Sequence, residues 1–204
     1  ELVKEHCDLQ VIAMVRPRGG GFCYDSEDFA QMERECEDLL CHGADGIAFG
    51  CLNSDATLCR SQNERLIERI HASGREAVFH RAFDCCSDPF LAIEELIAMG
   101  VDRVLTSGQK PKAMEGRELI AQLQKRYGGQ IQILAGSGVN AGNARQLMDE
   151  TGISQVHSSC KDWKSDPTTV VNGVSYAFAP APNEDCYDVV SEELVRRLLT
   201  AVGE

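Results

Sequence analysis

Histidines and charged residues follow several apolar runs of this sequence, at the points where those runs end. The stretch VFHRAFD places His80, Arg81 and Asp84 directly after one run, and His157 follows a later run in the same way. A histidine in this position can act as a general base or a metal ligand, and Asp84 can orient His80. The pattern predicts a catalytic cluster of His80, Asp84 and His157. The alternative is a hydrogen-bond network that closes the end of the sheet.

Arginines and glycine-serine turns in the neighbouring loops add groups that bind anions. Arg16 and Arg18 flank a proline and precede three glycines, which let a ligand approach the backbone closely. Guanidinium groups hold carboxylate or phosphate bidentately, and backbone N–H groups in turns cradle phosphate. The alternatives are ion pairs with acidic neighbours and ordinary turn chemistry. The predicted anion-binding residues are Arg16, Arg18, Arg81, Ser107, Gly136, Ser137, Gly138, Ser158 and Ser159.

The chain has ten cysteines and five histidines. No CxxC pair occurs, which argues against a zinc ribbon or a thioredoxin-like redox site. Reduced thiols in a cytosolic protein are the favoured interpretation. Thiolates together with histidine suit Cu(I), although spacing along the chain does not show that they converge. Of the cysteines that follow apolar runs, the predicted metal ligands are Cys23, Cys85 and Cys160.

Short apolar runs alternate with helical patterns along the chain. The runs are rich in Val, Ile, Leu and Phe, as strands buried on both faces of a parallel sheet are. The predicted strands are Leu9–Val15, Gly46–Gly50, Glu76–Phe79, Arg103–Leu105, Ile131–Ala135 and Ser154–His157. The predicted helices are Glu27–Cys41, Gln62–Ala72, Pro89–Met99, Glu115–Tyr127, Ala141–Glu150 and Ser191–Val202. Asp88 before Pro89 predicts a helix start, and Gly100 and Gly152 predict helix ends.

This repeat of strand, loop, helix and short turn predicts an α/β fold with right-handed crossovers. The loops after the strands are long and carry the unusual residues, whereas the turns after the helices are short. That asymmetry favours a TIM-like (β/α) barrel, in which all strand C-termini meet at one face, over an open doubly wound sheet. We expect a single domain over residues 1–204, with the first two β/α units of the barrel missing from this chain.

Composition excludes two classes of partner. The 204 residues are 43% hydrophobic and carry a net charge of −12, with no clustered Lys and Arg of the kind that neutralises phosphates in nucleic acids. No apolar stretch approaches the roughly 20 residues that a membrane span needs. We therefore expect neither a nucleic acid nor a membrane as partner.

The loop motifs, taken together and in order, resemble those of the CutC family of copper homeostasis proteins. They are RPRGG (16–20), FCY (22–24), FHRAFD (79–84), RVLTSG (103–108) and VHSS (156–159). The resemblance implies a TIM-like barrel, a cytoplasmic location and a role in copper handling, and it leaves open whether the protein is an enzyme. Family members carry an acidic residue and a cysteine on two further N-terminal strands, which this chain lacks.

Two main functions remain open from the sequence, and a third possibility is a non-catalytic scaffold. The first is copper homeostasis, with Cu(I) bound by thiols and histidines at the carboxyl ends of the strands. The second is a TIM-barrel enzyme for a small phosphorylated or carboxylated metabolite, held by the arginines and the glycine-serine loops. The segment from Lys161 to Cys186, with Trp163 and Tyr176, has no clear periodicity and predicts a lid, an oligomer contact or an ordered surface loop. We expect a homo-oligomer, either a dimer or a tetramer.

Overall fold

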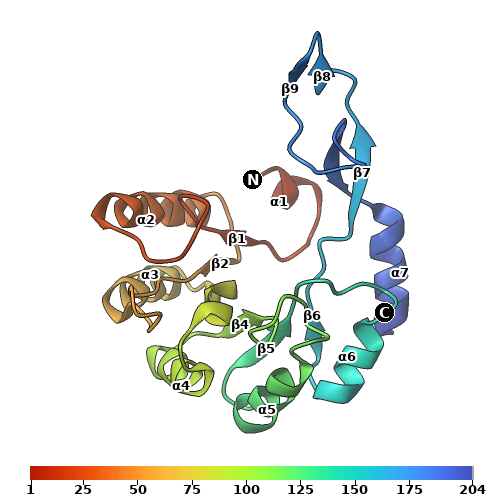
Figure 1. The fold of residues 1–204 in the computed structure, drawn as a ribbon. Helices are drawn as coiled ribbons and strands as arrows, with labels where there is room; N and C mark the ends of the chain where they lie inside the picture. The colour runs from red at the N-terminus through yellow and green to blue at the C-terminus, as the bar shows by residue number, and fades with distance from the viewer. Residues whose placement is uncertain (204) are drawn as a thin grey trace.

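The computed structural model describes residues 1–203, and its centre is a six-stranded sheet (Figure 1). All the strands in this sheet are parallel and lie in chain order, so each helix crosses over to the adjacent strand. They are β1 (Ile12–Met14), β2 (Gly46–Phe49), β3 (Glu76–Phe79), β4 (Arg103–Thr106), β5 (Gln132–Ala135) and β6 (Gln155–Val156). The sheet curls as part of a barrel does (Figure 1). The parallel α/β fold is confirmed, while a closed barrel with two further units stays a prediction, as does the single domain.

Helices cover the convex side of the sheet (Figure 1). They are α2 (Ser26–Cys41), α3 (Arg60–Ala72), α4 (Pro89–Met99), α5 (Arg117–Tyr127) and α6 (Ala144–Thr151). A short helix, α1 (Leu2–His6), precedes β1, the 3-10 turn η1 (Arg81–Cys85) follows β3, and α7 (Glu192–Val202) is the last helix of the described residues. The predicted start of α4 is confirmed, because the Asp88 side chain accepts hydrogen bonds from the N–H groups of Phe90 and Leu91. Gly100 ends α4 in the left-handed conformation at φ 87°.

The two faces of the sheet differ because successive side chains of a strand point to opposite sides. Ile47, Phe49 and Phe79 are fully buried in the core that the sheet forms with the helices. Val78 is also buried but lies outside that core, and Met14 on the edge strand is 58% exposed. At the amino ends of the strands, a chain of hydrogen bonds and one ion pair joins Gln10, Glu76, Arg103, Gln132 and Gln155. The concave face is therefore polar at this end.

The region after β6 contains more regular structure than the sequence predicts. Strand β7 (Lys161–Ser165) pairs antiparallel with β10 (Cys186–Val190), and between them β8 (Val170–Val171) pairs antiparallel with β9 (Val174–Ser175). Local periodicity did not reveal these strands because β7 and β10 lie far apart in sequence. None of the helices within residues 1–203 combines the length and apolar character that crossing a bilayer requires.

Candidate functional site

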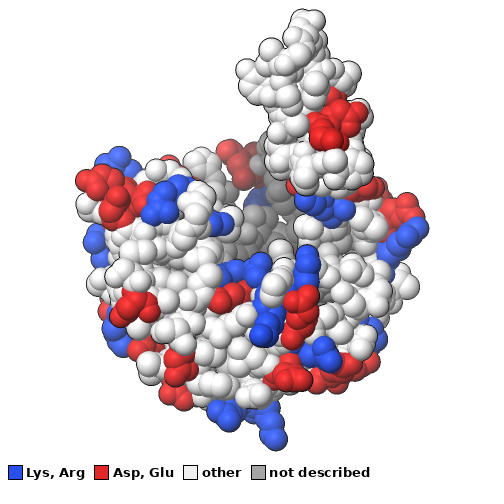
Figure 2. All heavy atoms as spheres, viewed as in Figure 1, with Lys and Arg blue, Asp and Glu red and all other residues white. Residues whose placement is uncertain are grey.

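The loops that follow β1, β3 and β4 meet at the carboxyl end of the sheet, which we call the mouth. Figure 2 shows this face of the molecule hollowed near its centre, with Lys and Arg side chains on the rim of the hollow. The motif residues around Arg16, His80 and Ser107 lie in these loops. Since parallel strands end together at one edge, the topology places them at the same end of the molecule.

His80 is the buried polar group of the mouth. Its backbone N–H donates to the Phe49 carbonyl at 2.8 Å, which continues the β2–β3 ladder by one residue. The side chain is 4% exposed, and its ring lies 5.0 Å from the Phe22 ring, centroid to centroid. Gly50 makes this packing feasible, because a Cβ atom there would lie 2.6 Å from His80 Nδ1. Burial in these surroundings lowers the pKa of His80 to about 4.

The hydrogen bonds of His80 set its tautomer. Nδ1 accepts from the Ala82 N–H at 3.2 Å, so a neutral ring carries its proton on Nε2. Nε2 is buried and has no hydrogen-bond partner within residues 1–203. An unsatisfied buried donor is costly, which indicates that a ligand group or water would bind there. In this tautomer His80 is suited to donate a hydrogen bond to a bound oxygen atom.

Asp84 holds the loop after β4 against η1. Its side chain is 7% exposed and forms an ion pair with Arg81 at 2.8 Å. It accepts hydrogen bonds from Thr106 Oγ1 at 2.6 Å, from both the N–H and the Oγ of Ser107, and from the Gln109 N–H. Arg81 also donates to Ser107 Oγ at 2.8 Å. The predicted pairing of Asp84 with His80 is wrong, because the Asp84 oxygens are occupied by these donors and His80 Nδ1 by the η1 backbone.

The two arginines of the first loop differ in how many partners their guanidinium groups already have within the molecule. Arg18 forms an ion pair with Asp28 at 2.7 Å, donates to the Cys23 carbonyl and lies over the Tyr24 ring, so its role is structural. Arg16 donates to the Gly20 carbonyl at 2.7 Å, and its guanidinium lies 4.9 Å from the centre of the Phe22 ring. The side chains of Arg16, Phe22 and His80 thus form one contiguous cluster, in which the Phe22 and His80 rings are tilted by 58° to each other.

The loops after β5 and β6 form a separate cavity of about 280 Å³. Its lining includes Gly138, Asn140, Ser158, Ser159, Cys160 and Lys161, and the base of α7. Ser158 Oγ donates to the Val139 carbonyl at 2.7 Å and accepts from the Cys160 N–H at 3.2 Å. Ser137 Oγ donates instead to the Pro111 carbonyl, so it braces two loops. The predicted anion-binding residues therefore fall into two groups, because this cavity is lined by neither Arg16 nor Arg81.

His157 lies neither with the residues around His80 nor in the lining of the cavity beside Ser158. It lines a second cavity of about 420 Å³ beside the edge strand β6, whose other walls include Arg103 and Leu134 of the sheet, Met148 of α6 and Leu198 of α7. Its ring nitrogen lies near Gly136, where an added Cβ would approach it to 3.3 Å. The residue is exposed, yet its ring is partly desolvated by the cavity wall, and this desolvation lowers its pKa. His157 and His80 contact different surroundings, and no hydrogen bond links them within residues 1–203.

The ten cysteines are all free thiols. Cys51 and Cys86 are buried, and desolvation raises the pKa of both, that of Cys86 to about 12, so both stay protonated. Cys160 is buried as well, whereas the predicted ligands Cys23 and Cys85 are exposed. Within residues 1–203, no three His, Cys, Asp or Glu side chains are grouped closely enough to hold a metal ion.

Sequence reasoning missed the aromatic part of the site. Phe22 and Tyr24 pack under Arg16 and Arg18, and the buried Tyr24 hydroxyl has no partner among the described residues. The signal was present, because each aromatic residue lies six positions after the arginine that it contacts. Arginine and aromatic side chains that share one short loop can form cation–π pairs, and the structure shows two of them here.

The fold and mouth define an α/β protein with a parallel, barrel-like sheet and a polar site at the carboxyl ends of its strands. The chain belongs to the CutC family, whose sequence model matches residues 1–162.

Similar proteins agree with this assignment. A CutC family protein of Treponema denticola is 39% identical over 203 residues, 99% of this chain and 82% of that protein. A CutC family protein of Vibrio cholerae is 34% identical over 195 residues, 96% of this chain and 77% of that protein. The crystal structure of a Streptococcus agalactiae CutC protein, named for copper homeostasis, has a TM-score of 0.66 and 32% identity. That match covers 71% of this chain and 70% of the solved one.

Proposed function

We propose that this protein serves copper homeostasis in the cytoplasm by binding Cu(I) as cargo at exposed thiols of the mouth. The observation that carries the proposal is the exposure of Cys23 and Cys85, on loops after β1 and β3, in a member of the CutC family. Thiolate sulfur is the protein ligand that Cu(I) prefers, and ten free thiols suit a reducing compartment.

In this proposal Cu(I) binds at exposed thiols on the surface of the mouth and not in an enclosed site. Buried Cys51 and Cys86 are poor candidates, because their raised pKa values keep them protonated. Exposed thiols leave coordination positions free for ligands from another carrier, which suits exchange of the ion better than storage. Because a cluster of three ligands is missing from residues 1–203, we expect modest affinity.

An anaerobic titration of the reduced protein with Cu(I) and a competing chelator tests this proposal. The double variant Cys23→Ser, Cys85→Ser is expected to bind Cu(I) about tenfold or more weakly, a loss of about 1.4 kcal/mol. Cys41→Ser is the matched control, since Cys41 is an exposed thiol at the far end of α2, away from the mouth. Equal affinity of the double variant and the control, or binding no tighter than that of glutathione, would refute the proposal.

A second candidate function is binding, and chemistry, of a small anionic metabolite at the mouth. The buried Nε2 of His80, which has no partner among the described residues, favours it, because Phe22 packs between the His80 ring and Arg16. A neutral imidazole N–H and a guanidinium are preorganised donors, which stabilise negative charge on a carboxylate or phosphate. Because the pKa of His80 lies near 4, its donor stays neutral at physiological pH.

Calorimetric titration with inorganic phosphate and with small dicarboxylates, in the absence of copper, tests the second candidate. We expect His80→Asn and Arg16→Met each to weaken binding of the best anion about tenfold. Arg34→Met is the control, because Arg34 is an exposed arginine on α2. The candidate fails when anions bind the two mouth variants as tightly as they bind the control.

A further inference from the structure

Two of the free thiols lie opposite each other in a short hairpin that follows β2. Leu52 and Leu58 form an antiparallel bridge. In the same register Cys59 lies opposite Cys51, and the Cys59 N–H donates to the Cys51 carbonyl at 3.0 Å. Residues directly opposite each other in an antiparallel pair present their side chains on one face, with Cα atoms about 5.5 Å apart. This separation lies within the range that a disulfide spans, about 4.4–6.8 Å.

The backbone of the two cysteines is held in place by Asn63. Its buried side chain accepts from the Cys51 N–H through Oδ1 and donates to the Cys51 carbonyl through Nδ2, each at 2.9 Å. The Asn63 N–H donates to the Cys59 carbonyl at 3.0 Å, so this one residue of α3 positions both cysteines. Because the backbone is already fixed, a bond between the two sulfur atoms costs little additional entropy.

The two thiols differ in their surroundings. Cys51 is fully buried, whereas Cys59 is half-buried and its Sγ lies 3.8 Å from Ser61 Oγ. Burial raises the pKa of the Cys51 thiol, and the charge of Cys59 raises it further, which indicates that the two sulfur atoms lie close to each other. A reagent in solution therefore reaches Cys59 first, while Cys51 stays a protonated thiol behind it.

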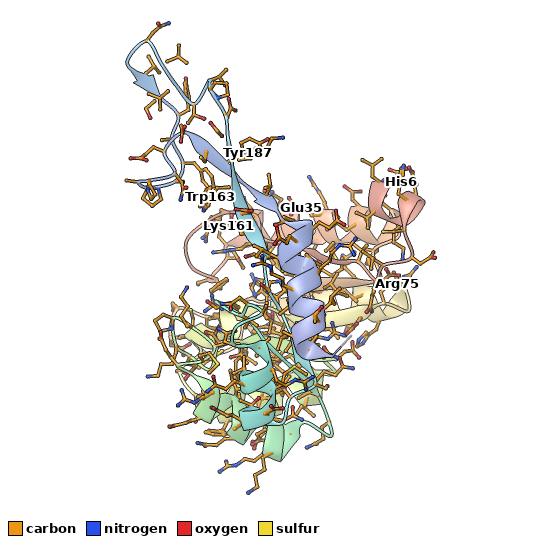
Figure 3. All side chains as sticks on the ribbon, turned by 90° about the vertical axis from the view of Figure 1, so that its right-hand side faces the viewer. His6, Glu35, Arg75, Lys161, Trp163 and Tyr187 are labelled. Atoms are coloured by element: carbon orange, nitrogen blue, oxygen red, sulfur yellow. The ribbon has the colours of Figure 1, made fainter. Side chains whose placement is uncertain are left out.

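The hairpin is part of the mouth, because the loop after β2 starts at the carboxyl end of the sheet. Helix α3, which follows it, lies away from the β7–β10 ladder in both views of the molecule (Figures 1 and 3). Gly50, next to Cys51, contacts His80, and the Leu52 N–H donates to the Phe22 carbonyl at 2.8 Å. A covalent bond at Cys51 would thus fix the segment that supports the contact between Phe22 and His80.

We propose that Cys51 and Cys59 form a reversible disulfide by exchange with a low-molecular-weight disulfide such as oxidised glutathione. Cys59, as its thiolate, attacks one sulfur of the reagent and breaks its S–S bond, and the released thiolate takes up the proton that Cys59 lost. The Cys51 thiol then attacks the Cys59 sulfur of the mixed disulfide, and its proton goes to the second thiolate that leaves. Two protein thiols are oxidised and one reagent disulfide is reduced to two thiols, and the reverse exchange restores both cysteines.

This site needs neither copper nor a bound anion, so its presence is independent of Cu(I) and anion binding at the mouth. In a reducing compartment a disulfide of this kind is a redox sensor and not a permanent structural bond.

Peptide mapping of the reduced protein after incubation with oxidised glutathione and a metal chelator tests the proposal. A protease that cuts after acidic residues separates the two cysteines at Asp55, so the disulfide joins peptides 46–55 and 56–64, each of which has one cysteine. These joined peptides are expected at about tenfold or more the level of any other joined pair. In protein unfolded by urea this preference should fall about tenfold, because the hairpin no longer holds the thiols opposite each other.

Two variants test the order of the steps. Cys51→Ala should stop the exchange after the first step, so that glutathione accumulates on Cys59 about tenfold above its level in the unmodified protein. Cys41→Ser is the matched control, because Cys41 is an exposed thiol at the end of α2, and this variant should form the joined peptides as the unmodified protein does. Mapping of the unmodified protein gives the main result even where Cys51→Ala folds poorly.

Three results would overturn the proposal. The first is that peptides 46–55 and 56–64 are not joined, or are joined no more than other pairs. The second is a preference for this pair that is unchanged in urea. The third is a folded Cys51→Ala variant that accumulates no glutathione on Cys59.

Discussion

Asp84→Ala is expected to destabilise this protein more than any other single change at the mouth. The carboxylate is 7% exposed and forms an ion pair with Arg81. It also accepts hydrogen bonds from Thr106, Ser107 and Gln109. Its removal leaves a partly buried guanidinium and several donors without their acceptor. Leaving the buried donors of Thr106 and Ser107 without their acceptor costs about 2–3 kcal/mol, and the lost ion pair adds little because the Arg81 side chain is 42% exposed. For a chain of this size such a loss lowers Tm by roughly 8 °C.

Urea unfolding followed by circular dichroism measures this loss. Asp88→Ala is the matched control, because Asp88 is also an aspartate that accepts backbone hydrogen bonds, but at an exposed helix start. Removing a helix cap of this kind costs about 1 kcal/mol. A loss no larger for Asp84→Ala than for Asp88→Ala would show that the carboxylate does not hold η1 against the loop after β4.

Acidification is expected to destabilise the protein through His80. The pKa of His80 is 6.5 in the unfolded chain and about 4 in the folded one, because burial disfavours the charged ring. Between these pH values the imidazole of His80 is protonated in the unfolded state and neutral in the folded state. The stabilisation is therefore complete above pH 6.5, falls as the pH decreases toward 4 and changes no further below it. The shift corresponds to about 3 kcal/mol.

The variant His80→Asn isolates this contribution. Asn has no titrating group, and its Oδ1 can accept the hydrogen bond that the Ala82 N–H donates to Nδ1. The free energy of unfolding, measured in urea from pH 7.5 to 4, should fall more steeply for the unmodified protein than for this variant. His42→Asn, at an exposed position after α2, serves as the control and should keep the original slope. Parallel pH profiles for the unmodified protein and His80→Asn would contradict the buried, neutral state of His80.

The sequence determined the elements, because their signals are local. Short runs of Val, Ile and Phe bounded by glycine formed strands, and Asp88 with Pro89 started α4 where the sequence predicts. The left-handed residues Gly100 and Gly152 ended helices as expected. The ordered loop motifs also identified the family. Each of these signals depends on a few neighbouring residues, so it can be recognised without knowing how the rest of the chain folds.

Only the tertiary structure decided which partner each polar group takes. Asp84 bonds to Thr106 and Ser107 rather than to His80, because sheet register brings the loop after β4 against η1. Phe22, from a distant loop, contributes to the burial of His80 by packing on its ring. The β7–β10 ladder likewise joins segments with no shared local pattern. Hydrogen bonds and burial depend on groups that are distant in sequence. These groups come together only when the strands have paired in the correct register.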